Sequence, residues 1–306
     1  MDSPDFADPA WLDTLAFAGA SADEIDRLAL AKRPNLRMFE HPLCRVRLRV
    51  ERRDSNRPVL VFLPDGPASI ESYDALIERL LPHFDLVIIE IPGFGYSHPK
   101  APQALEFEPS VDIHAAAYAS LKLPPAVWVG PCAGGLMAIG VAKRHPALVR
   151  ALLVMQTGDW AAEARWGGAL LDPKGQLRAP HAGQVMFRLA REKMAVDWWA
   201  KFAAGPDLDV EALQREARLL VRQHCCYALA SSLQHLCARA VEPDLIVSTP
   251  ATVVWGLADR SHAGTDRASI LRYLPQAQWV ELDRVGHFAD LEAIEVVQRE
   301  AAKLIG

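Results

Sequence analysis

The chain has 306 residues, of which 51% are hydrophobic and 23% charged, so it has enough apolar material for a large buried core. The formal net charge of -5 leaves no basic excess to neutralise phosphates, which argues against a nucleic-acid-binding protein. No apolar run approaches the roughly 20 residues that cross a bilayer, and the acidic start MDSPDFADPAW lacks a signal pattern, so we expect a cytoplasmic protein without a membrane partner.

The first predicted elements are a helical arm and a set of antiparallel strands. Ser21-Ala-Asp-Glu24 has the form of a capping box that opens a helix over 22–32, and Pro34 helps to end it. From about 36 to 50 the pattern alternates, which predicts strands. Within that stretch the side chains of Arg45, Arg47 and Arg49 recur at a period of two, which favours the solvent-exposed face of an edge strand.

Buried strands and helices then alternate along the chain. Apolar runs over 59–63, 86–91, 126–129 and 151–155 predict strands covered on both faces, and helices are expected over 69–81, 110–121 and 133–144. The same rhythm returns after residue 243, with strands at 252–255 and 278–282 and helices at 266–273 and 291–304. This order predicts an α/β fold with a mostly parallel, doubly wound sheet and right-handed crossovers.

Between the two α/β parts lies a segment that contains helical patterns only, notably over 185–200 and 210–238. It is too long for a simple loop inside a compact domain, so we interpret it as an inserted helical cap. The predicted organisation is therefore a core of residues 1–157 and 244–306, with residues 1–35 as an N-terminal helical arm, and a cap of residues 158–243.

The strongest chemical signal is Gly130-Pro131-Cys132-Ala133-Gly134, which lies between a predicted strand and a predicted helix. Small residues two before and two after the middle position let the backbones pass each other in a strained turn, which presents Cys132 at the carboxyl edge of the sheet. The following helix dipole and a nearby imidazolium should favour ionisation of its thiol. A buried cysteine in a glycine-rich packing corner is the alternative interpretation.

Two later residues fit the remaining parts of a nucleophilic site. Trp255-Gly-Leu-Ala-Asp259 places a carboxylate beyond one strand, and Arg284-Val-Gly-His287-Phe places an imidazole beyond the last strand. We expect Cys132 to attack a carbonyl carbon, His287 to act as base, and Asp259 to orient the imidazole. Asp159, which follows the strand at 151–155, is the second candidate for the acid.

These segments resemble the α/β-hydrolase superfamily, in particular its helix-capped branch of esterases, carbon-carbon bond hydrolases and epoxide hydrolases. Glu90-Ile-Pro-Gly-Phe-Gly-Tyr-Ser97 is similar to the acidic-x-Pro-Gly-x-Gly-x-Ser loop of that family. The Trp-Gly-x-x-Asp and Gly-His-Phe segments are also similar to segments of the family. The resemblance implies an α/β-hydrolase fold from about residue 36 onward. A cysteine at the elbow is similar to dienelactone hydrolases, and it argues against epoxide hydrolases and haloalkane dehalogenases, which need an aspartate there.

The first oxyanion loop departs from the family, which commonly has His-Gly where this chain has Asp65-Gly66-Pro67-Ala68-Ser69. Proline has no N–H to donate. If Pro67 occupies the donor position, the oxyanion hole relies on the N–H of Ala133 together with the N–H of Ala68 or a side chain. Loss of one donor typically costs about 10² to 10³ in rate.

The predicted function is a cofactor-independent hydrolase that acts on an ester, lactone or thioester through an acyl-cysteine intermediate. Alternatives are an acyltransferase or thioesterase-like enzyme of a biosynthetic pathway, and a non-catalytic ligand-binding receptor on a hydrolase scaffold. A small acyl or ester substrate is the expected partner, a homodimer is left open, and no cofactor or metal is expected. The five cysteines, an odd set without C-x-x-C, favour reduced thiols over a disulfide framework or a zinc site. Candidate pocket residues are Trp160, Trp166, Phe187, Trp198, Trp199 and Phe288.

Overall fold

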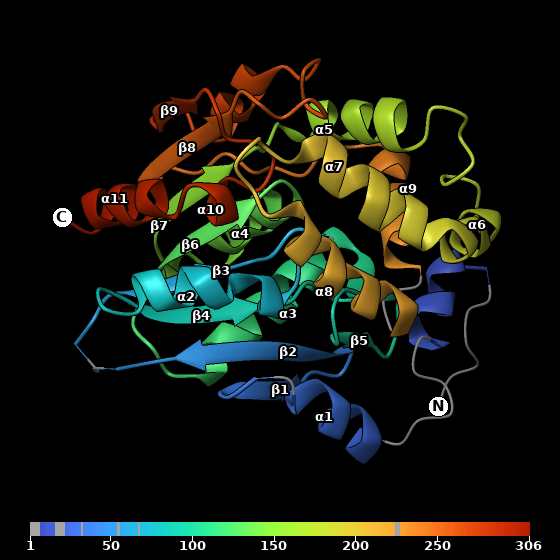
Figure 1. The fold of residues 1–306 in the computed structure, drawn as a ribbon, viewed down its shortest axis with the longest axis horizontal. Helices are drawn as coiled ribbons and strands as arrows, with labels where there is room; N and C mark the ends of the chain where they lie inside the picture. The colour runs from blue at the N-terminus through green and yellow to red at the C-terminus, as the bar shows by residue number, and fades with distance from the viewer. Residues whose placement is uncertain (1–6, 16–21, 32, 54–55, 67, 224–226) are drawn as a thin grey trace.

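The computed structural model describes residues 7–15, 22–31, 33–53, 56–66, 68–223 and 227–306. Their centre is a nine-stranded sheet in the order β1-β2-β4-β3-β6-β7-β8-β9, with β5 paired to β2 (Figure 1). The strands are β1 Leu36–Glu40, β2 Cys44–Glu51, β3 Val59–Phe62, β4 Asp85–Ile89, β5 His98–Pro99, β6 Ala126–Pro131, β7 Val149–Met155, β8 Ala251–Gly256 and β9 Gln278–Leu282.

The sheet is mostly parallel, as the alternation of strands and helices predicts. All pairs from β4 through β9 are parallel, whereas β2 pairs antiparallel with β1, β4 and β5. The chain moves outward from β3 to β4 and then returns to place β6 on the other side of β3. Loops that leave the carboxyl ends of strands on the two sides of such a reversal diverge, and the crevice between them is where open α/β sheets bind ligands.

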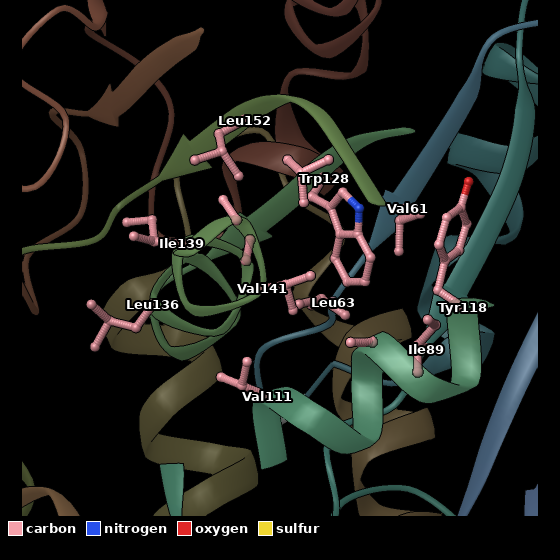
Figure 2. Packing of buried hydrophobic residues seen from close by; sticks show 14 of the residues in the cluster. Val61, Leu63, Ile89, Val111, Tyr118, Trp128, Leu136, Ile139, Val141 and Leu152 are labelled. Atoms are coloured by element: carbon pink, nitrogen blue, oxygen red, sulfur yellow. The ribbon is translucent and has the colours of Figure 1, made fainter. Parts of the chain in front are cut away.

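Helices cover both faces of this sheet. Successive residues of β3 face opposite layers: Val61 packs with the layer of α3 and α4, and Leu60 with the layer of α2 and α11. Figure 2 shows the first layer, in which the indole of Trp128 meets the ring of Tyr118 edge-on at 5.4 Å. The helices are α1 Ala22–Leu30, α2 Asp74–Leu80, α3 Phe107–Ser120, α4 Ala133–Arg144, α5 Trp160–Trp166, α6 Ala182–Arg191, α7 Trp199–Ala203, α8 Val210–Gln223, α9 Ala228–Ala238, α10 Ala289–Glu292 and α11 Ile294–Ile305.

Between β7 and β8 the described residues form helices α5 to α9 and no strand. Two stretches, Gly167–Leu171 and Glu192–Trp198, are π-helical. The second joins α6 to α7, so the chain is helical from 182 to 203. The single helical run expected over 210–238 is instead two helices, α8 and α9. No helix in the part of the chain that the structure describes is both long and apolar enough to span a bilayer.

The arginine stripe on β2 is buried, so the expectation of a solvated edge face is wrong. Strand β2 lies between β1 and β4, and the side chain of Arg47 is fully inaccessible. Its guanidinium makes two hydrogen bonds to the Glu71 carboxylate, at 2.7 and 2.8 Å, and also contacts Glu90. The ring of Tyr96 lies 4.5 Å away across its face. A period of two predicts which side chains share a face, but not that carboxylates from elsewhere cover that face.

The Glu90–Ser97 loop is folded around the same carboxylate. Glu90 accepts the backbone N–H of Tyr96 at 2.8 Å. Gly95 has a φ of +58°, and a Cβ at this position would lie 2.0 Å from a Glu90 oxygen. Only glycine therefore allows the loop to close on Glu90, which explains the Pro-Gly-x-Gly spacing in physical terms.

We predict that Arg47→Met lowers the free energy of unfolding by about 3–5 kcal/mol, because it leaves Glu71 and Glu90 buried without their cation. The change should move the midpoint of urea unfolding without changing the slope. The control is Arg144→Met, which removes an exposed pair with Asp112 and should cost no more than about 1 kcal/mol. Equal midpoint shifts for the two variants would contradict this account of the cluster.

Candidate active site

Cys132 occupies the sharp corner between β6 and α4. Its backbone has φ 47° and ψ −117°, a conformation that a non-glycine residue adopts only under strain. A Cβ on Gly130 would lie 2.3 Å from the backbone of Gly134, and a Cβ on Gly134 would lie 2.2 Å from the Leu63 carbonyl oxygen. The two glycines are thus required for the strand and helix to meet as closely as they do.

The sequence-predicted partners come from other strand ends at the same edge of the sheet. Cys132 follows β6, Asp259 follows β8 and His287 follows β9. The Nδ1 of His287 lies 2.9 Å from the Oδ2 of Asp259, and both side chains are fully buried. One ring nitrogen of His287 lies within 4.8 Å of the Cys132 sulfur. The structure therefore brings these three residues together.

Asp259 is held as an anion by a set of hydrogen bonds. Its Oδ1 accepts the N–H of Ser261 at 2.8 Å, and its Oδ2 accepts the Gln156 side-chain amide at 3.0 Å. Burial by itself raises the pKa of this carboxyl, but the charge and hydrogen bond of His287 outweigh it and lower the pKa to about 2. The second candidate acid, Asp159, instead caps α5 by accepting the N–H of Ala162 at 2.8 Å.

A second carboxylate, Asp65, contacts the other ring nitrogen of His287. It follows β3, and its Oδ2 lies 3.1 Å from the Nε2 of His287. Burial lowers the pKa of the imidazole, but Asp259 and Asp65 together raise it well above its ordinary value. At neutral pH His287 is therefore a cation between two carboxylates. From sequence, Asp65 is expected only as part of the oxyanion loop, where it stands in place of the histidine that the family commonly has.

A third buried carboxylate lies beside the thiol. The Cys132 sulfur donates to the Oε2 of Glu163 at 3.9 Å, and the Oε1 of Glu163 accepts the N–H of Gly158 at 2.5 Å. Burial raises the pKa of Glu163 to about 7. Burial and the charges of Asp65 and Glu163 also raise the pKa of the Cys132 thiol well above its ordinary value, against the opposing effect of His287. The expectation of a readily ionised thiol is therefore wrong. It considered only the helix dipole and the imidazolium, whereas burial and two carboxylates oppose ionisation of the thiol.

His262 is a further site residue that the sequence analysis missed. The Cys132 sulfur and one ring nitrogen each of His262 and His287 lie within 4.8 Å of one another. The His262 ring stacks on Trp166 with 4.4 Å between centroids and on His287 with 5.2 Å. Burial and the nearby His287 charge lower its pKa to about 3, so it is neutral. Its position three residues after Asp259 is the only signal that sequence offers for it.

The expected oxyanion hole has one clear donor position among the described residues. Ala133 begins α4 and lines the cavity, and its N–H belongs to the first helical turn, which has no intrahelical acceptor. The N–H of Ala68, expected as an alternative donor, instead closes a turn on the Asp65 carbonyl at 2.9 Å, so that expectation is wrong. Pro67 lies outside the described residues.

A cavity of about 190 Å³ opens above Cys132. Of the predicted pocket residues, Trp160, Trp166 and Phe187 line it, whereas the side chains of Trp198 and Trp199 lie outside the part that the structure describes. Phe288, also expected in the lining, does not belong to it. It is buried, and its ring packs edge-on against His287 at 5.4 Å.

The comparisons with known proteins agree with this architecture. Residues 58–293 match the family described as alpha/beta hydrolase fold. The chain belongs to the α/β-hydrolase fold family. The expected fold class is thereby confirmed, as is the resemblance to the α/β-hydrolase superfamily.

Curated relatives of this α/β-hydrolase family member match it over a limited segment. The pimeloyl-[acyl-carrier protein] methyl ester esterase of Xanthomonas campestris is 32% identical over 114 residues, which are 37% of this chain and 42% of that protein. The protein of the same name from Vibrio vulnificus is 35% identical over 113 residues, 36% of this chain and 42% of that protein. The aligned segment thus spans less than half the length of these relatives.

Solved structures resemble this α/β-hydrolase over nearly its whole length. An epoxide hydrolase from Bacillus megaterium has a TM-score of 0.69 at 14% identity, and the alignment covers 88% of this chain and 99% of that chain. Est816, an N-acyl homoserine lactone degrading enzyme, has a TM-score of 0.66 at 16% identity and covers 87% and 99% of the two chains. At these identities the likeness shows the fold alone.

We predict that Glu163→Gln raises the alkylation rate of Cys132 by iodoacetamide at pH 8, where the native carboxylate is mostly ionised. Removing this negative charge lowers the thiol pKa and increases the thiolate fraction. The rate is measured by intact-mass spectrometry. Glu242→Gln, which changes a half-exposed carboxylate paired with Arg272, serves as the control and should leave the rate unchanged. A Glu163→Gln rate at or below that of the native protein would refute the assigned charge effect.

Proposed function

We propose that the protein is a cofactor-independent hydrolase that cleaves an ester, lactone or thioester through an acyl-cysteine intermediate on Cys132. The observation that carries this proposal is the strained elbow thiol at the base of an apolar cavity, beside a histidine hydrogen-bonded to Asp259. Such an arrangement supplies a nucleophile, a proton carrier and the group that orients it.

The proton positions favour a route that differs from the simple one expected from sequence. Since His287 is already cationic, we assign the first proton transfer to Glu163, which accepts from the thiol. The thiolate then attacks the carbonyl carbon, and the leaving group departs with the Nε2 proton of His287. Neutral His287 next takes a proton from water, whose oxygen attacks the acyl-cysteine and releases the carboxylic acid and the Cys132 thiolate, and Glu163 returns its proton to that thiolate.

An oxyanion hole with few donors favours substrates with good leaving groups. Ala133 is the one amide donor that the geometry assigns, because the Ala68 N–H is already bonded to Asp65. A weak oxyanion hole stabilises the tetrahedral intermediate less, which slows substrates with poor leaving groups most. Thioesters, activated esters and enol lactones are therefore better suited than amides. The esterase names of the curated relatives support the ester class.

We further propose that residues 158–243 act as a cap over this cavity. Helix α5 supplies Trp160 and Trp166, α6 supplies Phe187 and α9 supplies Leu233 to its lining. These apolar side chains would enclose a neutral acyl group and exclude water from the acyl-cysteine. The acyl group could then pass to water or to another alcohol or amine, so an acyltransferase is the nearest variant.

A ligand-binding protein without turnover is the second candidate. It is favoured by the raised pKa of the Cys132 thiol and by the engagement of the Ala68 N–H, both of which work against nucleophilic catalysis. A cavity of this kind would still bind an apolar ligand.

We predict that brief incubation with p-nitrophenyl esters and acyl thioesters adds one acyl group to the native protein and none to Cys132→Ala. Intact-mass spectrometry detects the adduct, and release of p-nitrophenol follows turnover. Cys237→Ala, which changes a half-buried thiol outside the cavity, is the matched control and should acylate normally. Ligand-induced thermal stabilisation without adduct or turnover would instead establish the binding protein.

Substrate charge provides a further prediction. Asp65 and Glu163 line the cavity, and no lysine or arginine is among its described lining residues. A free carboxylate on the acyl chain should therefore lower kcat/KM by roughly tenfold or more relative to a neutral chain of equal length, by charge repulsion. Comparing p-nitrophenyl hexanoate with mono-p-nitrophenyl adipate tests this, and Glu163→Gln should narrow the difference. A preference for the adipate ester would contradict it.

A further inference from the structure

Three potential metal ligands converge at the base of the cavity. The Cys132 sulfur and one ring nitrogen each of His262 and His287 lie within 4.8 Å of one another, and all three residues are buried. Sulfur and imidazole nitrogen are the donors that zinc and similar soft cations prefer. Bond lengths of about 2.0–2.3 Å to zinc place tetrahedral ligand atoms roughly 3.3–3.8 Å apart, so closure by about 1 Å would complete the set.

The second observation is an unsatisfied nitrogen on His262. The Nε2 of this ring is buried and has no hydrogen-bond partner among the residues that the structure describes, although the side chain is only 3% exposed. Buried polar atoms without partners are rare and costly, and they point to a missing ion, water or ligand. The mechanism proposed above uses the thiol and His287 but leaves this nitrogen without a role.

Both imidazoles are also oriented as ligands usually are. The Nδ1 of His287 is bonded to Asp259 at 2.9 Å, and the Nδ1 of His262 lies 3.1 Å from the hydroxyl of Thr265. Such partners fix the ring orientation and leave Nε2 as the coordinating atom. Asp65, whose Oδ2 lies 3.1 Å from the Nε2 of His287, adds a carboxylate oxygen in position to act as a fourth ligand.

We propose that Cys132, His262 and His287, with Asp65 as a fourth ligand, bind one zinc ion or a similar thiophilic divalent cation, and that occupancy blocks the thiol. Binding forms a metal–sulfur bond and two metal–nitrogen bonds. It releases the thiol proton and the Nε2 proton of His287 to solvent, and no oxidation or reduction takes place. Because the same sulfur cannot both hold the cation and attack a carbonyl, metal binding and acylation exclude each other.

The test uses the full chain in a background with Cys225→Ser and Cys226→Ser. These adjacent cysteines lie outside the described residues, and as a vicinal pair they would bind zinc themselves. Co²⁺ is the spectroscopic probe, since a bound thiolate gives a near-ultraviolet charge-transfer band. Competition with a chromophoric chelator then gives the Zn²⁺ affinity. Neither readout depends on turnover, so failure of the proposed hydrolase function would not affect this test of metal binding.

We expect one Co²⁺ per chain with a thiolate band that Cys132→Ser abolishes. Losing a hydrogen-bond partner behind a metal-bound histidine typically costs about 10- to 100-fold in affinity, so His262→Gln should weaken Zn²⁺ binding by at least that much. Cys237→Ser removes a half-buried thiol elsewhere and should leave the affinity unchanged. A missing thiolate band, or equal affinity in His262→Gln and the parent protein, would overturn the proposal.

A second measurement covers the case in which His262→Gln does not fold. Zn²⁺ should slow iodoacetamide labelling of Cys132 in the parent protein, as resolved by peptide mapping, and leave labelling of Cys237 unchanged. Labelling of Cys132 at the same rate with and without Zn²⁺ would show that the cation does not bind the thiol.

Discussion

The chemistry of this site depends on one buried histidine held between two carboxylates. Asp259 and Asp65 bond the two ring nitrogens of His287, which keeps the imidazole protonated inside a largely apolar interior. One positive charge then faces two negative ones, and the carboxylate of Glu163 adds to the imbalance when it ionises. Burial, together with this excess of negative charge, raises the pKa of the Cys132 thiol and keeps it neutral at rest. The proposed nucleophile, the proposed proton carrier and the proposed substrate preference all depend on this charge distribution.

Much of the fold and part of the site could be predicted from local patterns. Apolar runs identified the central strands, and glycine spacing identified the elbow at Cys132, because both depend on residues close together in the sequence. Asp259 and His287 were found because residues after parallel strands meet at one edge of the sheet. Asp65 acquires its role through a contact with His287, 222 residues along the chain, and His262 through its approach to Cys132 and His287 in the folded chain. No periodicity encodes such contacts.

The buried arginines of β2 show a case in which a local pattern predicts the wrong environment. Their alternation is the same as that of a solvated face. For Arg47 the difference lies in Glu71, from the short 3-10 helix Ile70–Tyr73, and in Glu90, from the loop after β4. The same holds for the amide of Ala68, whose availability depends on whether the Asp65 carbonyl turns toward it. Residue type and spacing define what a side chain can do, but the neighbours supplied by the fold decide whether it does so.

The order of the site residues along the chain has a consequence for biosynthesis. Cys132 leaves the ribosome well before His262 and His287, which adjoin β8 and β9 at the end of the strand order. A partly synthesised chain therefore carries an ordinary cysteine without a proton carrier or a second imidazole beside it. The proposed acylation and the proposed metal binding both require the final strands to dock. The topology thus delays the chemistry until folding is nearly finished.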